Sequence, residues 1–112
     1  MLVQPRTHPY HPATNPAAPT LYEETASADL QARILGNLVG YFVSEIGPLN
    51  QTVHLWAYQS LDDRATRRAA LMKEPLWQDF LGRVTPMILR QESKILLPTA
   101  FSPVGGERGE SD

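Results

Sequence analysis

The sequence predicts one α+β domain in which helices cover one face of an antiparallel sheet. Two apolar segments rich in β-branched and aromatic residues flank a Gly-Pro-Leu-Asn turn, and this pattern predicts a β-hairpin. Helical periodicity appears both before and after the hairpin, and an extended segment lies toward each end of the chain. The resulting order of elements is βαββαβ, which is the ferredoxin-like split motif.

A strand and a helix precede the hairpin. Residues 1–12 alternate weakly in polarity and predict a strand, although Pro5 and Pro9 each remove a ladder donor. A proline-rich connection follows. Apolar positions at helical spacing then predict a helix from about residue 20 to residue 35, and Gly36 is suited to a left-handed position at its C-terminus.

The two hairpin strands are predicted at residues 38–47 and 51–58. A turn centred on Pro48 would place Val43 opposite His54, with Glu45 as a diagonal neighbour of that histidine. The same register pairs Tyr41 with Trp56 on the same face, and Phe42 with Leu55 on the other. Both faces are largely apolar or aromatic, and helices can cover only one of them, so we expect a second subunit to cover the other.

A helix in two pieces and a last strand complete the motif. Ser60 begins a Ser-x-x-Asp arrangement that resembles a capping box, and Pro75 either stops that helix or starts the next. Residues 86–97 predict the last strand. The expected buried stripe of the first piece is Leu61, Ala65, Ala69 and Met72. The positions expected on its solvated face are Arg64, Arg67 and Arg68.

The composition excludes several classes of protein. The chain has 112 residues, no cysteine and a formal charge of −2. Disulfides, thiolate metal sites and cysteine nucleophiles are therefore absent, and nothing in the charge balance attracts nucleic acid or an anionic membrane. His8 and His11 would need a third ligand to hold zinc, so we expect no metal and no cofactor. The N-terminus lacks the pattern of a secretory signal, which favours a cytoplasmic location. We expect one domain over residues 1–103 and a flexible polar tail over 104–112.

The candidate site lies on the hairpin. His54 beside Glu45 could act as an acid or base, because a carboxylate orients an imidazole and raises its pKa. Tyr41 and Trp56 could form the wall of a pocket for a flat apolar ligand, and Arg90 could hold an anionic oxygen. The same residues could instead have a purely structural role. In that reading the histidine and the aromatics are core or interface residues, and Arg90 pairs with Glu92.

Several stretches resemble the NIPSNAP family. These are the opening RTHPY, the string GYFVSEIGPLNQTVHLWAYQSLDDRATRRAAL, and the later EPLWQDFL and ILRQESKILLPTAFSP, which together span about residues 1–103. The resemblance implies a ferredoxin-like fold of the dimeric α+β barrel type and no established biochemical activity. The chain is similar to the short, single-domain bacterial members, and Pro5 and Pro9 depart from the family's first strand.

These observations lead to one hypothesis and two alternatives. The leading hypothesis is a homodimeric barrel that binds a small apolar or aromatic molecule between sheet and helices. The first alternative is a non-catalytic interaction or scaffold protein. The second is an enzyme similar to cofactor-free monooxygenases or isomerases, which is an analogy of fold alone.

Overall fold

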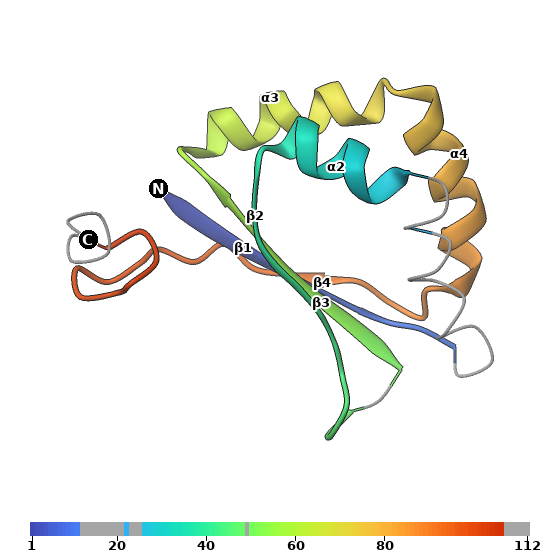
Figure 1. Ribbon diagram of the computed structural model, residues 1–112, viewed down its shortest axis with the longest axis horizontal. Coiled ribbons are helices and arrows are strands. Elements are labelled where there is room, and N and C mark those ends of the chain that lie inside the picture. Colours follow the sequence, from blue (N-terminus) through green and yellow to red (C-terminus); the bar gives the residue numbers. More distant parts are fainter. Residues whose placement is uncertain (12–21, 23–25, 49, 107–112) are drawn as a thin grey trace.

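A computed structural model describes residues 1–11, 22, 26–48 and 50–106. Helices in the described part pack on one face of a four-stranded antiparallel sheet with strand order β2-β3-β1-β4 (Figure 1). The strands are β1 (Leu2–Pro9), β2 (Asn37–Val43), β3 (Gln51–Tyr58) and β4 (Glu92–Ser93). The helices are α2 (Ser27–Leu35), α3 (Leu61–Met72), α4 (Pro75–Val84) and the 3-10 turn η1 (Thr85–Met87). The predicted order is therefore confirmed, with Pro75 as the first residue of α4.

The strand β1 lies inside the sheet even though it contains two prolines. Residue by residue it pairs with β3, from Leu2 opposite Tyr58 to Pro9 opposite Gln51. The carbonyls of Pro5 and Pro9 point the other way, toward the segment that contains β4, and accept hydrogen bonds from the amides of Lys94 (3.1 Å) and Leu89 (2.7 Å). Because the N–H and C=O of one strand residue point to the same side, the missing proline donors also fall on that side. The ladder with β3 is therefore intact.

The last strand is much shorter than predicted. Residues 88–96 run antiparallel along β1, but regular strand is confined to Glu92–Ser93, with isolated bridges at Tyr10–Ile88 and Val3–Leu96. The missing donors of the two prolines on this side of β1 account for the interruptions. Residues 85–87, at the predicted start of the strand, form the turn η1 instead.

The hairpin register differs from the predicted one by two residues. His54 lies opposite Tyr41 rather than Val43, and a bulge interrupts the ladder between Leu38 and Gly40. The strand β2 ends at Val43, and the Ser44 amide donates to the carbonyl of Gln51 at 3.0 Å, so the connection is longer than a tight turn. A shift of two residues keeps Tyr41 and His54 on their predicted face, because side chains alternate with a period of two. The bulge changes the register by one more residue and places Leu38 opposite Trp56, where Tyr41 was predicted.

The helix α3 faces the sheet with a different side from the one predicted. Ser60 caps it as expected, since its hydroxyl accepts from the Asp63 amide at 3.0 Å. The predicted buried stripe is turned outward, however, and Leu61 is 58% exposed. The arginines expected in solvent are half-buried, and the Arg64 Nε donates to the buried Gln4 side chain at 2.8 Å. A row of polar side chains on the inner face of β1 and β3 explains this orientation, because it supplies partners that the arginines can reach.

The first helix is predicted from about residue 20, and most of its expected first residues, like the proline-rich connection, lie outside the described residues. The described helix α2 spans Ser27–Leu35. It ends as predicted at Gly36, which has a φ of 97°. A Cβ at this position would meet the Arg67 guanidinium at 2.6 Å, so both the backbone and the space favour glycine.

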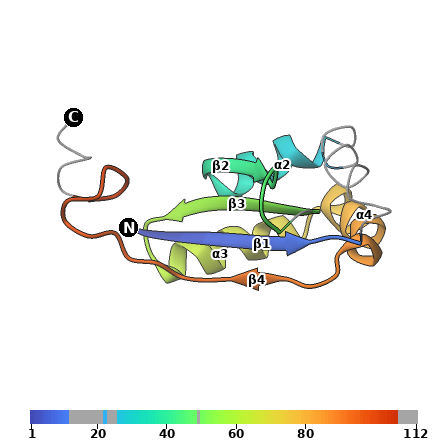
Figure 2. The ribbon, with the colours of Figure 1, turned by 90° about the horizontal axis from the view of Figure 1, so that it is seen from below.

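The core lies between the sheet and the helices. Its buried members are Leu2, Tyr10, Leu30, Leu35, Trp56, Tyr58, Leu71, Trp77, Phe80 and Val84. The opposite sheet face has no described helix over it, as Figure 2 shows from the strand side. Among the described helices, none is long and apolar enough to cross a membrane. The predicted tail is described only up to residue 106.

Candidate functional site

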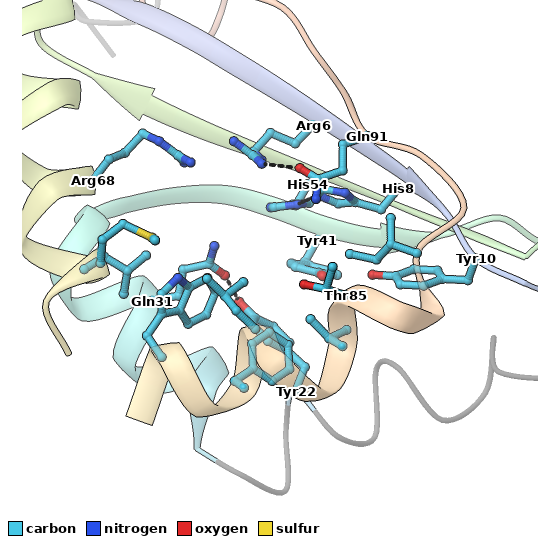
Figure 3. Close-up of a pocket in the computed structure, with 17 residues that line it drawn as sticks. Arg6, His8, Tyr10, Tyr22, Gln31, Tyr41, His54, Arg68, Thr85 and Gln91 are labelled. Atoms are coloured by element: carbon cyan, nitrogen blue, oxygen red, sulfur yellow. Dashed lines mark hydrogen bonds between the residues drawn. The ribbon is translucent and has the colours of Figure 1, made fainter. Parts of the chain in front are cut away.

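A cavity of about 300 Å³ lies between the sheet and the helices (Figure 3). The sheet side contributes the polar and aromatic residues Arg6, His8, Tyr10, Tyr41, His54 and Gln91. The helix side contributes mostly apolar residues, chiefly Leu71, Met72, Trp77, Phe80, Leu81 and Val84. The cavity is also lined by Tyr22, Gln31 and Arg68. The cavity therefore has a polar wall on the sheet and an apolar wall on α3 and α4.

The alternation of side chains along the strands determines which residues form the polar wall of the cavity. The even-numbered residues of β1 point toward the helices, and Arg6 lies opposite His54 on β3. His54 in turn lies opposite Tyr41 on β2. Arg6, His54 and Tyr41 thus form one row across three neighbouring strands, with His8 one step further along β1.

Two histidines meet in this wall. The Nε2 atoms of His8 and His54 are 3.0 Å apart, and the side chains are buried, with 7% and 3% exposure. The Tyr41 ring stacks on His54 with centroids 4.6 Å apart and an angle of 20° between the planes. On the far side, the Trp56 Nε1–H donates to Nδ1 of His54 at 2.5 Å. His54 is therefore held by three different side chains.

The hydrogen bonds fix where the protons lie on the two rings. An indole N–H can only donate, so Nδ1 of His54 accepts and the proton of the neutral ring is on Nε2. That proton is donated to Nε2 of His8, which leaves the proton of His8 on Nδ1. This Nδ1 is buried and has no hydrogen-bond partner among the described residues. The chain from Trp56 through His54 thus ends in an unused buried donor on His8.

Burial keeps both histidines neutral at pH 7. It lowers the pKa of His54 to about 3, with smaller contributions from His8 and Arg6, and lowers the pKa of His8 to about 4, with a contribution from Arg6. Burial followed by the charge of Arg68 lowers the pKa of Arg6 to about 10. Burial raises the pKa of Tyr41, so its hydroxyl is also neutral. The positive charge of the cavity at pH 7 is therefore carried by its arginines.

The structure brings some of the predicted site residues together and separates others. Tyr41 and His54 line the cavity, and Trp56 lies directly behind His54, with no exposed surface. Glu45 lies beyond the end of β2 in an exposed loop, and the altered register takes it away from His54. Arg90 is exposed and pairs with Glu92 at 3.3 Å, which is the structural reading of that residue. Neither Glu45 nor Arg90 is among the cavity residues.

Of the six residues on the polar wall, the sequence predicts only Tyr41 and His54 as site residues. His8 was treated as a weak metal ligand paired with His11, whereas His8 is inside the cavity and His11 is exposed. Arg6 was not singled out, and Arg68 was assigned to a solvated face. The even-numbered residues from Leu2 to Tyr10, which are Leu, Gln, Arg, His and Tyr, carried a signal of one functional face. The prolines between them obscured it.

The fold and cavity define a class: a small ferredoxin-like α+β domain with an aromatic, cationic cavity beneath its helices. Within that class the chain belongs to the NIPSNAP family, whose model matches residues 3–103. A NIPSNAP family protein of Agrobacterium tumefaciens is 46% identical, with a TM-score of 0.87 over 92% of this chain and 97% of that one. A second protein of that organism, described as a NIPSNAP family protein with unknown function, is 45% identical, with a TM-score of 0.87 over 93% of both chains.

Other relatives match less of the molecule. The NipSnap homolog of Dictyostelium discoideum is 43% identical over 54% of this chain and 27% of its own length, and the human homolog 2 is 38% identical over 59% and 23%. The chain thus spans about a quarter of these two curated relatives. A solved antibiotic biosynthesis monooxygenase is 9% identical, with a TM-score of 0.61 over 88% of this chain and 99% of that one. That likeness concerns the fold alone.

Proposed function

We propose that this protein is a homodimer that binds a small, mostly aromatic or apolar molecule in the cavity beside His54. The observation that carries the proposal is a pocket of about 300 Å³ between the sheet and the helices, next to the candidate histidine. Its volume is at the lower end of the range of known ligand pockets, and its mixture of apolar walls with few polar groups is typical of them. The scaffold alternative gives no reason for a pocket of this composition beside His54.

His54 serves in this proposal as a neutral hydrogen-bonding group of the binding site. A pKa of about 3 makes it a weak base near pH 7, and no carboxylate is among the described residues that line the cavity with it. The alternative of a monooxygenase-like or isomerase-like enzyme is supported by fold alone, so we assign no reaction.

A neutral aromatic probe should bind in the cavity. We expect N-phenyl-1-naphthylamine to gain fluorescence with the parent protein when it is excited at wavelengths that tryptophan does not absorb. Leu81→Trp adds bulk to the cavity wall and should weaken binding at least about tenfold, or ~1.4 kcal/mol. Leu76→Trp places the same side chain on an exposed part of α4 and should bind like the parent. Equal binding by the two variants, or no binding by the parent, would contradict the proposal.

The uncovered sheet face supports the homodimer. Phe42 is 56% exposed on this face, where its ring lies over Gly40, and Val39 and Leu96 are also exposed there. Apolar area of this kind on one sheet face is typical of an interface. Because a two-fold dimer uses the same patch on both subunits, one charge introduced on the patch acts twice.

Sedimentation should therefore show a dimer at micromolar concentration. Phe42→Lys should shift the protein to the monomer, because it buries two like charges in one interface. Leu61→Lys introduces the same charge on the outer face of α3 and should leave the dimer unchanged. A parent protein that sediments as a monomer at about 50 μM would argue against this assembly.

A further inference from the structure

Among the described residues, the cavity is lined by two cations and by no anion. Arg6 and Arg68 both line it, whereas no Asp or Glu is among its described lining residues. Figure 3 shows their guanidinium ends turned toward one another. The ion pairs of the described residues involve Arg67, Arg83 and Arg90 instead. Arg6 has a neutral partner, the side chain of Gln91 at 3.3 Å.

Two like charges that face each other need a counter-charge. Each partly desolvated guanidinium is costly unless it is paired, and a second one nearby raises the cost. A bound anion would supply this counter-charge. A planar guanidinium matches the geometry of a carboxylate and can donate hydrogen bonds to its oxygens. Two arginines that face the same space could therefore both bind one carboxylate.

The two arginines reach the cavity from different elements. Arg6 lies on β1 and Arg68 lies on α3, and both line the cavity. The sheet wall and the helix wall therefore each offer one charged donor group.

We infer that the ligand of this cavity is an aromatic or aliphatic carboxylate, whose anionic oxygens are bound by Arg6 and Arg68. The apolar body of the ligand lies against Trp77, Phe80 and Val84 on the helix side. This inference rests on the proposed function and specifies its ligand. A nucleotide or sugar phosphate fits less well, because its polar body would face these apolar side chains.

The test compares 2-naphthoate with 2-naphthamide, which have the same ring system and differ in charge. By calorimetry at pH 7.5 and low salt, the parent should bind the acid at least about tenfold more tightly than the amide. Arg68→Gln should weaken binding of the acid about tenfold and change binding of the amide less than twofold. Arg83→Gln removes an arginine paired with Asp79 on the outer surface of α4 and should leave both affinities unchanged.

Further variants separate charge from structure. Arg68→Lys keeps the charge and should retain part of the preference for the acid, and Arg6→Gln provides a second removal if Arg68→Gln fails to fold. Equal binding of acid and amide by the parent, or an unchanged preference in both glutamine variants, would overturn the inference and leave the proposed function standing. Failure of both naphthyl compounds and of the neutral probe described above would overturn the proposed function itself.

Discussion

Replacing Trp56 by alanine should lower the free energy of unfolding by about 3–5 kcal/mol. Trp56 has no exposed surface and is part of the main buried cluster, so the change removes a large apolar side chain where the surroundings cannot collapse fully. It also removes the donor to Nδ1 of His54. Urea unfolding at one fixed protein concentration measures the loss.

Trp56→Phe isolates the contribution of the hydrogen bond. It keeps an aromatic ring but leaves Nδ1 of His54 buried without its donor, which should cost about 1–3 kcal/mol. Nitrogen NMR of the imidazoles should show His54 protonated on Nε2 in the parent and a changed tautomer in the variant. Leu61→Ala, at an exposed position of α3, should stay within about 0.5 kcal/mol of the parent. A Trp56→Phe protein with parental stability and parental tautomers would show that the indole does not orient the histidine.

Acidification should destabilise the protein between about pH 6.5 and pH 4.5, before most carboxylates titrate. The ordinary pKa of histidine is 6.5, and in the folded state the values are about 4 for His8 and about 3 for His54. Between these limits the unfolded chain binds more protons than the folded one, so stability falls as the pH falls. The stability that the two neutral histidines contribute is fully present above pH 6.5. Below that pH, the slope of the free energy of unfolding against pH approaches ~1.4 kcal/mol per pH unit for each histidine.

Matched histidine variants test the source of this slope. His8→Gln removes one of the two buried imidazoles and should reduce the slope by about half. His11→Gln changes an exposed histidine three positions away and should keep the parental slope. Chemical denaturation at half-unit pH steps gives the measurement. A stability that does not change across this pH range would mean that the two buried rings are readily protonated in the folded protein.

The sequence alone was sufficient for the parts of this fold that depend on neighbours along the chain. Polarity alternation defined β3 from Gln51 to Tyr58 and placed His54 and Trp56 on one face of it. Ser60 and Gly36 marked helix ends because capping and positive φ are local properties. The family resemblance was also contained in the sequence, and the family model confirms it.

The tertiary structure decided which residues are partners across the sheet and between the sheet and the helices. The long connection after Val43 placed Tyr41 opposite His54, and the bulge near Gly40 placed Leu38 opposite Trp56. No local pattern specifies such a register. The packing of α3 turned its arginines inward, where Arg64 reaches Gln4, because the polar row on the sheet supplied partners. The pairing of His8 with His54 likewise depends on β1 lying beside β3, across 46 residues of sequence. Alternation within one strand is local, whereas a cavity wall built from several strands and helices depends on the free energy of the whole fold.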